Sequence, residues 1–457
     1  MNNRYISGKY DPFEINSIWF HEQSSLRDLV PKKMRILSTT GFFLYGLFVL
    51  LKIILKSLDT IITEKEITCR WNELNKKRLF FTPTSNNQKA VSSVIDLLRQ
   101  EKEGYIIIDK AFDIQYYPML KICLYSLKYL PWFTRHYKLN DDSDKRVILF
   151  NLSFFLLTPG VTRFYATVLK NVRPECVVFA NDHMSYCRNF ALVCEDYGIR
   201  TIYVQHASVS SAFPELIFTH SFLDGMDSLV KYTEKPKDSR GEVILLGALR
   251  YDPLSKYRVN RINYQRHCIG IAINDLDNND VANKFCNALL RQYPDITLKV
   301  RSHPALKNNP FVFDNKDRIK YTCATDESIT DYFDSIDLQI SGDSGVHFDA
   351  IIGGVPTLVY NFSSNPFLDN YKYVEKGLIK FASTNEDVFK LIDTKEIDVN
   401  NDLINYYDAS YGKSYAGNCS KIVAEFIING YEMSFLKDAY GLEKGELGNN
   451  TFYIIPR

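Results

Sequence analysis

The sequence predicts an α/β protein built from two doubly wound domains in series. Three observations predict this class: the chain is long, short apolar runs alternate with segments of helical spacing, and polar or glycine-rich turns follow several of the runs. The chain has 457 residues, of which 46% are hydrophobic. This is enough for two cores in domains of about 100 to 200 residues each.

The first series of alternating elements lies in the N-terminal half, which we assign to a domain over residues 1–255. Apolar runs that fit strands are separated by a segment whose apolar residues recur at helical spacing. Parallel strands joined by right-handed crossovers place the loops that follow them at one edge of the sheet. The predicted strands are residues 177–180, 201–204, 216–219 and 243–246, with a helix over 186–197 and a turn or helix over 221–230.

A polar stretch over residues 250–264, interrupted by proline and without a clear period, is the predicted linker. The second series then predicts a domain over residues 265–400, and residues 401–457 form a helical tail that can return to the first domain. The predicted strands of the second series are 268–273, 296–300, 319–322, 336–340 and 357–360, and its predicted helices are 279–292, 328–335 and 347–352.

The charge balance argues against nucleic acid as a partner. Formal net charge is +1, and charged residues make up 24% of the chain, so no overall field recruits a polyanion and any anion site is local. The nine cysteines contain no C-x-x-C pair and no spacing typical of zinc, which predicts a reduced compartment, most simply the cytoplasm.

One apolar segment near the N-terminus, residues 36–51, has no charged residue and is flanked by lysine and arginine. At 1.5 Å per residue, a helix of about 16 residues reaches about 24 Å, short of the roughly 30 Å hydrocarbon core of a bilayer. A spanning helix is therefore disfavoured. Two interpretations remain open: an interfacial or re-entrant segment whose cationic flanks attract anionic lipid, or a core helix of the N-terminal domain.

The turn Ser341-Gly342-Asp343-Ser344-Gly345 follows a predicted strand and precedes a predicted helix. Glycines let the backbone approach a ligand, hydroxyls donate hydrogen bonds, and a helix N-terminus favours an anion such as phosphate. Asp349, further along the helix, is placed to accept hydrogen bonds from a ribose diol. The pattern therefore predicts a nucleotide phosphate site, although an ordinary helix N-cap at Asp343 or Ser344 fits the same spacing.

Several short elements, in this order, resemble those of GT-B glycosyltransferases of bacterial capsule and lipopolysaccharide assembly, of teichoic-acid-type transferases and of the related sugar-nucleotide 2-epimerases. They span roughly residues 174–379. They are Gln205-His206 after a strand, with Ala207 where glycine is usual; Gly247 to Asp252 in the form Gly-x-x-Arg-x-Asp; Arg301-Ser302-His303-Pro304; Ser341-Gly342; Asp349-Ala350, where Glu is usual; and Gly354-Val355-Pro356.

The resemblance implies a GT-B architecture, two Rossmann-like domains facing a cleft, with the nucleotide-sugar donor bound by the C-terminal domain. By this resemblance His303 contacts the donor phosphate and Arg301 is a second anion partner. Asn274-Asp275 lies in the first loop of that domain, where donor phosphates or sugar often lie, although a simple turn also fits. Charge building on the departing phosphate is then stabilised without a metal or other cofactor.

A general base for the acceptor hydroxyl is expected from the N-terminal domain if the enzyme inverts configuration. Asp182, His183 and His206 follow predicted strands and are the candidates; a strand-end position alone does not select among them, and each also fits a structural role in its loop.

The expected function is transfer of a sugar from a nucleotide donor, with a CMP-activated acidic sugar favoured and a UDP-sugar next. The expected acceptor is a glycan or a lipid-linked glycan of the bacterial surface. The expected location is the cytoplasm, in peripheral contact with the inner face of the membrane. Two alternatives are a sugar-nucleotide 2-epimerase and a non-catalytic polysaccharide-assembly protein on the same scaffold.

Overall fold

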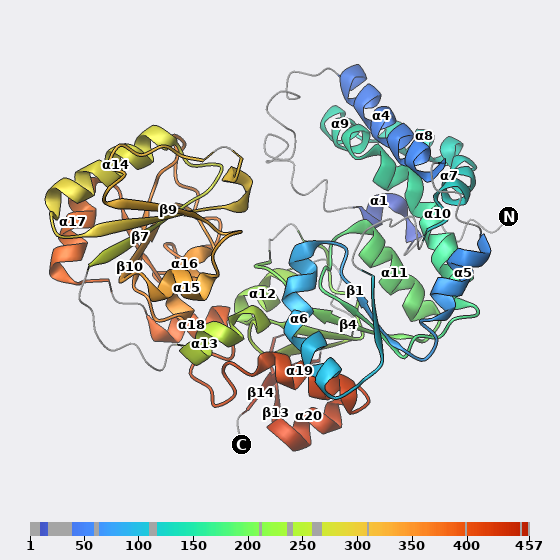
Figure 1. Ribbon diagram of the computed structural model, residues 1–457. Coiled ribbons are helices and arrows are strands. Elements are labelled where there is room, and N and C mark those ends of the chain that lie inside the picture. Colours follow the sequence, from blue (N-terminus) through green and yellow to red (C-terminus); the bar gives the residue numbers. More distant parts are fainter. Residues whose placement is uncertain are drawn as a thin grey trace. The chain divides into compact units, whose positions relative to one another are not determined.

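The computed structural model divides the described chain into two compact units (Figure 1). The first unit holds the described residues up to Leu246 together with Ser420–Ile455, and the second holds Gly247–Cys419. The residues described are 10–16, 39–58, 64–108, 117–209, 213–234, 241–257, 267–308, 310–397, 400–447 and 450–455.

The first unit contains an eight-stranded sheet in the order β13-β14-β6-β5-β4-β3-β1-β2. Every neighbouring pair is parallel except β13 and β14. The central strands are fully buried because both faces are covered, as is usual for parallel sheets. The strands are β1 (Arg78–Phe81), β2 (Tyr105–Ile108), β3 (Cys176–Phe179), β4 (Arg200–Val204), β5 (His220–Leu223), β6 (Glu242–Leu245), β13 (Leu442–Lys444) and β14 (Thr451–Ile454).

The helices of the first unit include a group, α4, α7, α8, α9 and α10, that packs mainly on itself beside the sheet (Figure 1). They are α1 (Pro12–Ile15), α4 (Thr39–Leu58), α5 (Glu64–Asn72), α6 (Ser85–Gln100), α7 (Met119–Leu127), α8 (Leu130–Leu139), α9 (Asp142–Phe150), α10 (Leu152–Leu169), α11 (Ser185–Asp196), α12 (Met226–Thr233), α19 (Cys419–Ile428) and α20 (Met433–Tyr440).

The second unit contains a six-stranded parallel sheet in the order β12-β11-β10-β7-β8-β9. Its strands are β7 (Cys268–Ile273), β8 (Thr297–Ser302), β9 (Ile319–Cys323), β10 (Leu338–Ser341), β11 (Thr357–Tyr360) and β12 (Lys380–Ala382). Its helices are η5 (Leu249–Tyr251), α13 (Asp252–Tyr257), α14 (Asn279–Gln292), η7 (Pro304–Leu306), α15 (Ile329–Asp334), α16 (Val346–Ile352), α17 (Asn385–Thr394) and α18 (Asn401–Tyr407). The predicted class, two doubly wound α/β domains, is confirmed.

Three local expectations differ from the structure. The predicted strand over 216–219 is irregular, and the strand is β5, four residues later, because Leu216 and Phe218 are buried in the core without joining the ladder. Part of the predicted linker is helical, and the division between the units precedes residue 255. Tyr251 and Leu254 are the reason, since both are buried in the core of the second unit.

The apolar segment 36–51 corresponds to α4 from residue 39 onward, and residues 36–38 lie outside the described residues. One side of α4 packs on α9 and α10: Phe42 is buried beside Leu149, and a Cβ on Gly46 would lie 2.1 Å from the Leu149 carbonyl oxygen. The other side is exposed, so α4 is neither wholly core nor wholly free.

Within the part of the chain that the structure describes, one helix, Leu152–Leu169, is long and apolar enough to cross a membrane. That helix is α10, and 67% of it is buried inside the first unit. Its burial is that of a core helix.

Candidate functional site

The second sheet has the strand order in which a nucleotide crevice is usual. Numbered along the chain, its strands lie in the order 3-2-1-4-5-6, with β7 at the point where the winding reverses toward β10. Ligands of such sheets bind outside the carboxyl ends of the strands at this reversal. The loops at that place are 274–277 after β7 and 342–345 after β10, both predicted as donor-binding from the sequence.

These two loops are in contact. A Cβ on Gly342 would lie 3.0 Å from Oδ1 of Asp277, so glycine permits the close approach. The other oxygen of Asp277 accepts a hydrogen bond of 2.8 Å from the Asn274 N–H, while Asp275 is exposed. Burial raises the pKa of Asp277 to about 6. Asp277, not singled out in the sequence, therefore forms one wall of the crevice.

Two of the predicted phosphate ligands in the turn after β10 make structural hydrogen bonds within the protein instead. The Ser341 hydroxyl is buried and donates to the Ala272 carbonyl oxygen at 2.8 Å, which ties β10 to β7. The Asp343 carboxylate accepts two hydrogen bonds from Asn370, at 2.9 and 2.7 Å. Ser344 is half-buried, and its hydroxyl oxygen accepts from the Val346 N–H at 3.4 Å, which leaves the hydroxyl hydrogen able to donate.

His347 holds this turn from below. Its Nε2 lies 2.8 Å from the Gly342 carbonyl oxygen, and its Nδ1 lies 2.6 Å from the Thr357 hydroxyl. Because a carbonyl can only accept, Nε2 carries the proton and Nδ1 accepts from Thr357. Burial lowers the pKa of His347 to about 4, so the ring is neutral. Gly345, at the start of α16, meets only Tyr371 at an ordinary contact distance.

Arg301 and His303 differ sharply in availability. Arg301 is 8% exposed, donates to the Glu327 carbonyl oxygen at 3.0 Å, and stacks on the Tyr332 ring at 5.2 Å. Burial lowers its pKa. The His303 ring is exposed, and its Nδ1 accepts from the Ala305 N–H at 3.2 Å, so the neutral ring presents an Nε2–H donor. His303 can therefore donate a hydrogen bond to an anion, whereas Arg301 has a structural role at the end of β8.

Asp349, the predicted ribose ligand, lies half-buried on α16. Burial raises its pKa, against the opposing effects of Arg250, Tyr251 and Arg301. The structure therefore brings Asp349 near Arg250, the arginine of the predicted Gly-x-x-Arg-x-Asp segment. A carboxylate in this place balances half-buried Arg250 and buried Arg301, and it can also accept hydrogen bonds from a diol.

The first sheet also reverses its winding, between β1 and β3, because β2 lies outside β1 while β4, β5 and β6 continue on the other side of β3. The loop that follows β3 carries Asp182 and His183. The loop that follows β4 carries His206. These three candidates lie at the carboxyl edge of one sheet, as the sequence predicted for parallel strands.

Asp182 is completely buried in a hydrogen-bonded network. Its carboxylate accepts from the Tyr232 hydroxyl at 2.6 Å and from the Tyr203 hydroxyl at 3.4 Å, and it lies 3.0 Å from His183 Nδ1. Burial alone would raise the pKa of Asp182, but the hydrogen bonds and charges of His183, Tyr232 and His206 lower it below its usual value. Asp182 is thus an ionised carboxylate beneath an imidazole.

His183 lies above this carboxylate with a side chain 22% exposed. The Nδ1–H donates to Asp182, which leaves the Nε2 lone pair as the acceptor, 3.5 Å from the Asn181 side-chain nitrogen. The ring packs on Phe213 at 4.3 Å between centroids, and the His206 ring lies at 6.1 Å. A buried carboxylate that orients a partly exposed imidazole is the arrangement of a general base.

Beside His206, Gln205 is buried and links its own loop to the loop after β5 and to helix α12. Its side chain donates to the Ala207 carbonyl oxygen and the Ser228 hydroxyl, each at 2.9 Å, and accepts from the Asp224 N–H at 3.0 Å. Gln205 therefore has a structural role, holding the ends of β4 and β5 together, and it positions half-buried His206.

The end of β1 was missed from the sequence. Thr82 is buried at the strand end, Thr84 caps α6, and buried Asn87 donates to the Ala180 carbonyl oxygen at 2.9 Å, next to the Asp182 loop. The signal was present: an apolar run over 79–81, a threonine cap, and a segment with apolar residues at helical spacing.

Within the described residues, no group of three or more His, Cys, Asp or Glu side chains is arranged to hold a metal ion. The acidic run at 141–144 forms the start of α9, with Asp141 as its N-cap.

Neither a family model nor a curated protein matches the chain. Among solved structures, it is similar to UDP-GlcNAc 2-epimerase from Neisseria meningitidis bound to UDP-GlcNAc, with 15% identity, a TM-score of 0.49, and 77% of this chain and 100% of that chain covered. It is also similar to the wall teichoic acid polymerase TagF, with 10% identity, a TM-score of 0.48, and 85% and 99% covered. These likenesses assign neither a substrate nor a reaction to this chain.

Proposed function

We propose that this protein is a GT-B glycosyltransferase that moves a sugar from a nucleotide donor to a glycan or lipid-linked glycan of the bacterial surface. The observation that carries the proposal is the pair of Asp182 and His183. A buried carboxylate fixes the tautomer of an imidazole whose other nitrogen is free of its proton and partly exposed. That nitrogen can take the proton of an acceptor hydroxyl as the hydroxyl attacks the anomeric carbon.

The donor side of the proposal is supported by the crevice of the second unit. The strand order places it at the reversal of the winding, Gly342 permits close approach, and His303 presents a hydrogen-bond donor to an anion. A CMP-activated acidic sugar is the favoured donor and a UDP-sugar the next. Departure of the phosphate is then assisted by neutral N–H and O–H donors, with no step assigned to a metal.

The proposed location is the cytoplasm, in peripheral contact with the inner face of the membrane. Its support is the exposed side of α4, where apolar side chains point away from the first unit. A soluble sugar-nucleotide 2-epimerase has no need of such a face, which is why transfer to a membrane-borne acceptor is preferred over the epimerase.

The first experiment is a calorimetric and thermal-shift screen of the protein against CMP, UDP, GDP and CDP. One nucleotide should stabilise the protein, because a ligand that binds only the folded state raises its apparent stability. His303→Ala should weaken that binding. If no nucleotide binds, the proposal of a transferase is abandoned in favour of a non-catalytic polysaccharide-assembly protein.

The second experiment separates transfer from epimerisation with the matching nucleotide sugar and membrane lipid extract. Transfer releases free nucleotide, whereas epimerisation leaves the nucleotide sugar intact as an isomer. Asp182→Asn should lower turnover by roughly 10²- to 10⁴-fold at unchanged nucleotide affinity, since it removes the charge that orients His183. Tyr232→Phe removes one neutral hydrogen bond to Asp182 and should cost far less. Equal losses in the two variants would contradict the role of the Asp182–His183 pair.

A further inference from the structure

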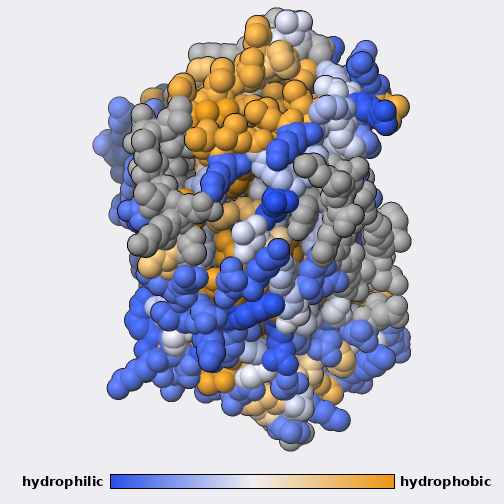
Figure 2. Space-filling model, turned by 90° about the vertical axis from the view of Figure 1, so that its right-hand side faces the viewer, coloured by the Kyte–Doolittle hydropathy of each residue, from blue (hydrophilic) through white to orange (hydrophobic). Residues whose placement is uncertain are grey.

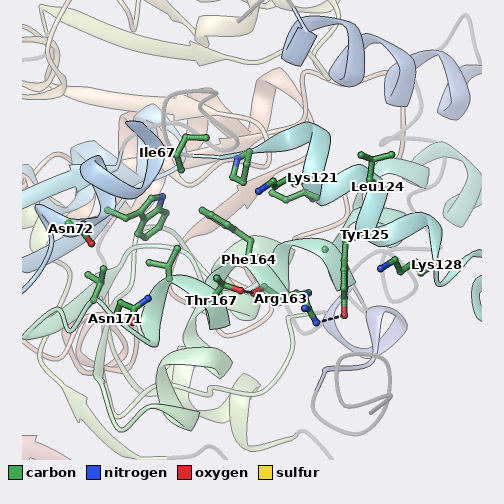
Figure 3. Close-up of a pocket in the computed structure, with 16 residues that line it drawn as sticks. Ile67, Asn72, Lys121, Leu124, Tyr125, Lys128, Arg163, Phe164, Thr167 and Asn171 are labelled. Atoms are coloured by element: carbon green, nitrogen blue, oxygen red, sulfur yellow. Dashed lines mark hydrogen bonds between the residues drawn. The ribbon is translucent and has the colours of Figure 1, made fainter. Parts of the chain in front are cut away.

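A cavity of about 400 Å³ lies in the first unit between α5, α7 and α10 (Figure 3). This volume is in the range of small-molecule sites, roughly 300 to 1,000 Å³. The cavity is separate from the loops that carry Asp182 and His183, which follow β3. Nothing in the proposed transfer reaction uses it.

The inner wall of the cavity is apolar. Trp71 and Ile122 are almost fully buried, and Phe164 and Val168 cover the adjoining wall. The Trp71 ring meets the Phe164 ring edge-on, at 5.6 Å between centroids. An apolar wall of this kind favours a hydrocarbon group.

The outer lining is cationic. Three lining residues carry positive charge, Lys121, Lys128 and Arg163, all of them exposed, and none of the described residues that line the cavity is acidic. The Arg163 guanidinium donates to the Tyr125 hydroxyl at 3.2 Å and lies 4.5 Å from the Tyr125 ring centroid, while the Lys128 amine lies 5.5 Å from the same ring. Tyr125 thus gathers two cations at one place (Figure 3).

Neither Lys128 nor Arg163 is paired with a carboxylate of the described residues. Two cations without a counter-ion, beside an apolar cavity, complement an anionic head on a hydrocarbon chain. An arginine with a neighbouring lysine is also a typical phosphate partner.

The cavity adjoins an exposed apolar face. Leu124 lines the cavity and is 56% exposed. It belongs with other exposed side chains on two helices that pack together, α7 and α4. Figure 2 shows hydrophobic side chains gathered over the upper part of this side of the molecule, bordered by hydrophilic ones. The exposed members are Phe43, Leu44, Phe48, Leu51 and Leu55 on α4, and Leu120, Leu124 and Leu127 on α7.

We propose that this cavity takes up one hydrocarbon chain of an anionic membrane phospholipid, with its phosphate held by Lys128 and Arg163 and its remaining chain lying along the apolar face of α7 and α4. The proposal deepens the proposed membrane contact and rests on it only as the source of the lipid. It adds a binding site for a single lipid molecule to the general interfacial contact that α4 makes with the bilayer.

The test uses Trp71 as a reporter inside the cavity, with lysophosphatidylglycerol that carries bromine on its chain as the probe, kept below its micelle concentration. Bromine quenches tryptophan emission on contact, so uptake should quench a saturable fraction of the emission. Trp71→Phe should remove that fraction. Quenching that persists undiminished in Trp71→Phe would overturn the proposal.

The site variants separate the head from the chain. Lys128→Gln with Arg163→Gln should weaken lysophosphatidylglycerol binding by roughly 10- to 100-fold, since each charge-assisted contact is worth a sizeable part of that factor. Binding of a brominated monoacylglycerol, which has the same chain but no phosphate and is weaker from the start, should change little. Thr167→Phe should fill the cavity and abolish uptake of both probes. Lys89→Gln and Ser92→Phe, exposed positions on α6, are the matched controls.

Vesicle flotation with phosphatidylglycerol distinguishes this site from the general membrane contact. Flotation that is retained in Thr167→Phe, together with lost probe uptake, supports a single-lipid cavity within a wider membrane face. Probe uptake that is equal for the two head groups, or that survives Thr167→Phe, overturns the proposal even if the protein floats. Nucleotide binding is measured on the same samples and reports separately on the donor site.

Discussion

At the scale of single residues, two buried neutral histidines set the response of the protein to acid. His347 holds the turn after β10, and burial lowers its pKa to about 4. His220, on β5 beside Glu242, has its pKa lowered to about 4 as well, mainly by burial. Each must gain a proton when the chain unfolds at mildly acid pH.

We expect these two histidines to lower the free energy of unfolding as the pH falls from about 6.5 toward about 4, because each binds a proton in the unfolded chain and not in the folded chain. Asp277, whose pKa burial raises to about 6, acts in the opposite sense in part of this window. A shift of this size corresponds to about 3 kcal/mol for one histidine at most. His347→Gln should reduce the difference in the free energy of unfolding between the two ends of this pH range. His267→Gln, at an exposed position, should leave that difference unchanged. Urea unfolding at pH 5 and at pH 7 measures this difference. An equal change of stability between the two pH values in His347→Gln and in the parent protein would contradict the prediction.

The sequence was informative about which residues stand at strand ends and less so about what they contact. Asp182 and His183 were both predicted, but their division into a buried carboxylate and a partly exposed imidazole depends on Tyr232 and Tyr203, 50 and 21 residues away in the chain. Arg301 was predicted as an anion partner, yet its guanidinium group contacts Glu327 and the Tyr332 ring instead. Such partners come from other strands and helices, which no local pattern reveals.

At the scale of elements, the turn after β10 contains two glycines with different surroundings. We expect Gly342→Ala to push Asp277 away and to weaken nucleotide binding, because the added methyl group meets its carboxylate at 3.0 Å. Gly345→Ala meets only the Tyr371 hydroxyl at 3.5 Å and should leave affinity nearly unchanged. Calorimetry with the nucleotide selected by the screen compares them, and equal affinities would place the ligand elsewhere.

Helix α4 shows why periodicity alone left two interpretations open. Its residues are apolar almost all round, so the same run fits a core helix and an interfacial helix. The structure makes it both, with Phe42 and Gly46 inward and Phe48 outward. Helices α9 and α10 determine which side of α4 is buried, and their contact with α4 could not be predicted from the sequence.

Gly46→Val should detach α4 from the first unit. A Cβ at this position lies within 2.1 Å of the Leu149 carbonyl oxygen and 2.9 Å of Leu152, and backbone cannot move aside cheaply. The expected cost is about 1 to 3 kcal/mol in the free energy of unfolding. Gly104→Ala, with nothing within 4 Å, is the control. Chemical unfolding measures both, and an unchanged stability in Gly46→Val would show that α4 is not packed there.

At the scale of the whole molecule, the doubly wound class followed from the alternation of strands and helices, most clearly in the second unit. There, β7, α14 and β11 have the predicted bounds. The first unit was harder, because β1 and β2 lie more than 65 residues before β3 and four helices intervene. Residues 401–457 were predicted as a helical tail, and their two strands in the first sheet, β13 and β14, were not predicted, since β14 is adjacent to β6 only in space.

Removal of β13 and β14 should destabilise the first unit alone. Without β14, the β6 strand loses one of its two parallel partners and keeps β5, and buried Thr451 and Ile454 leave the core. A chain ending at Tyr440 should therefore show a lowered unfolding temperature for the first unit, with nucleotide affinity of the second unit unchanged. Calorimetric unfolding with and without nucleotide tests this, and a simultaneous loss of nucleotide binding would contradict independent folding of the second sheet.

The position of β14 in the chain also bears on how the protein is made. All six strands of the second sheet leave the ribosome before β14 does, so the second unit can be complete while the first still has β6 as an open edge. An open edge is a template for strands of other chains. A pause in synthesis between β12 and β14 therefore exposes the nascent chain to intermolecular pairing, and we expect the speed at which residues 400–455 are translated to affect the yield.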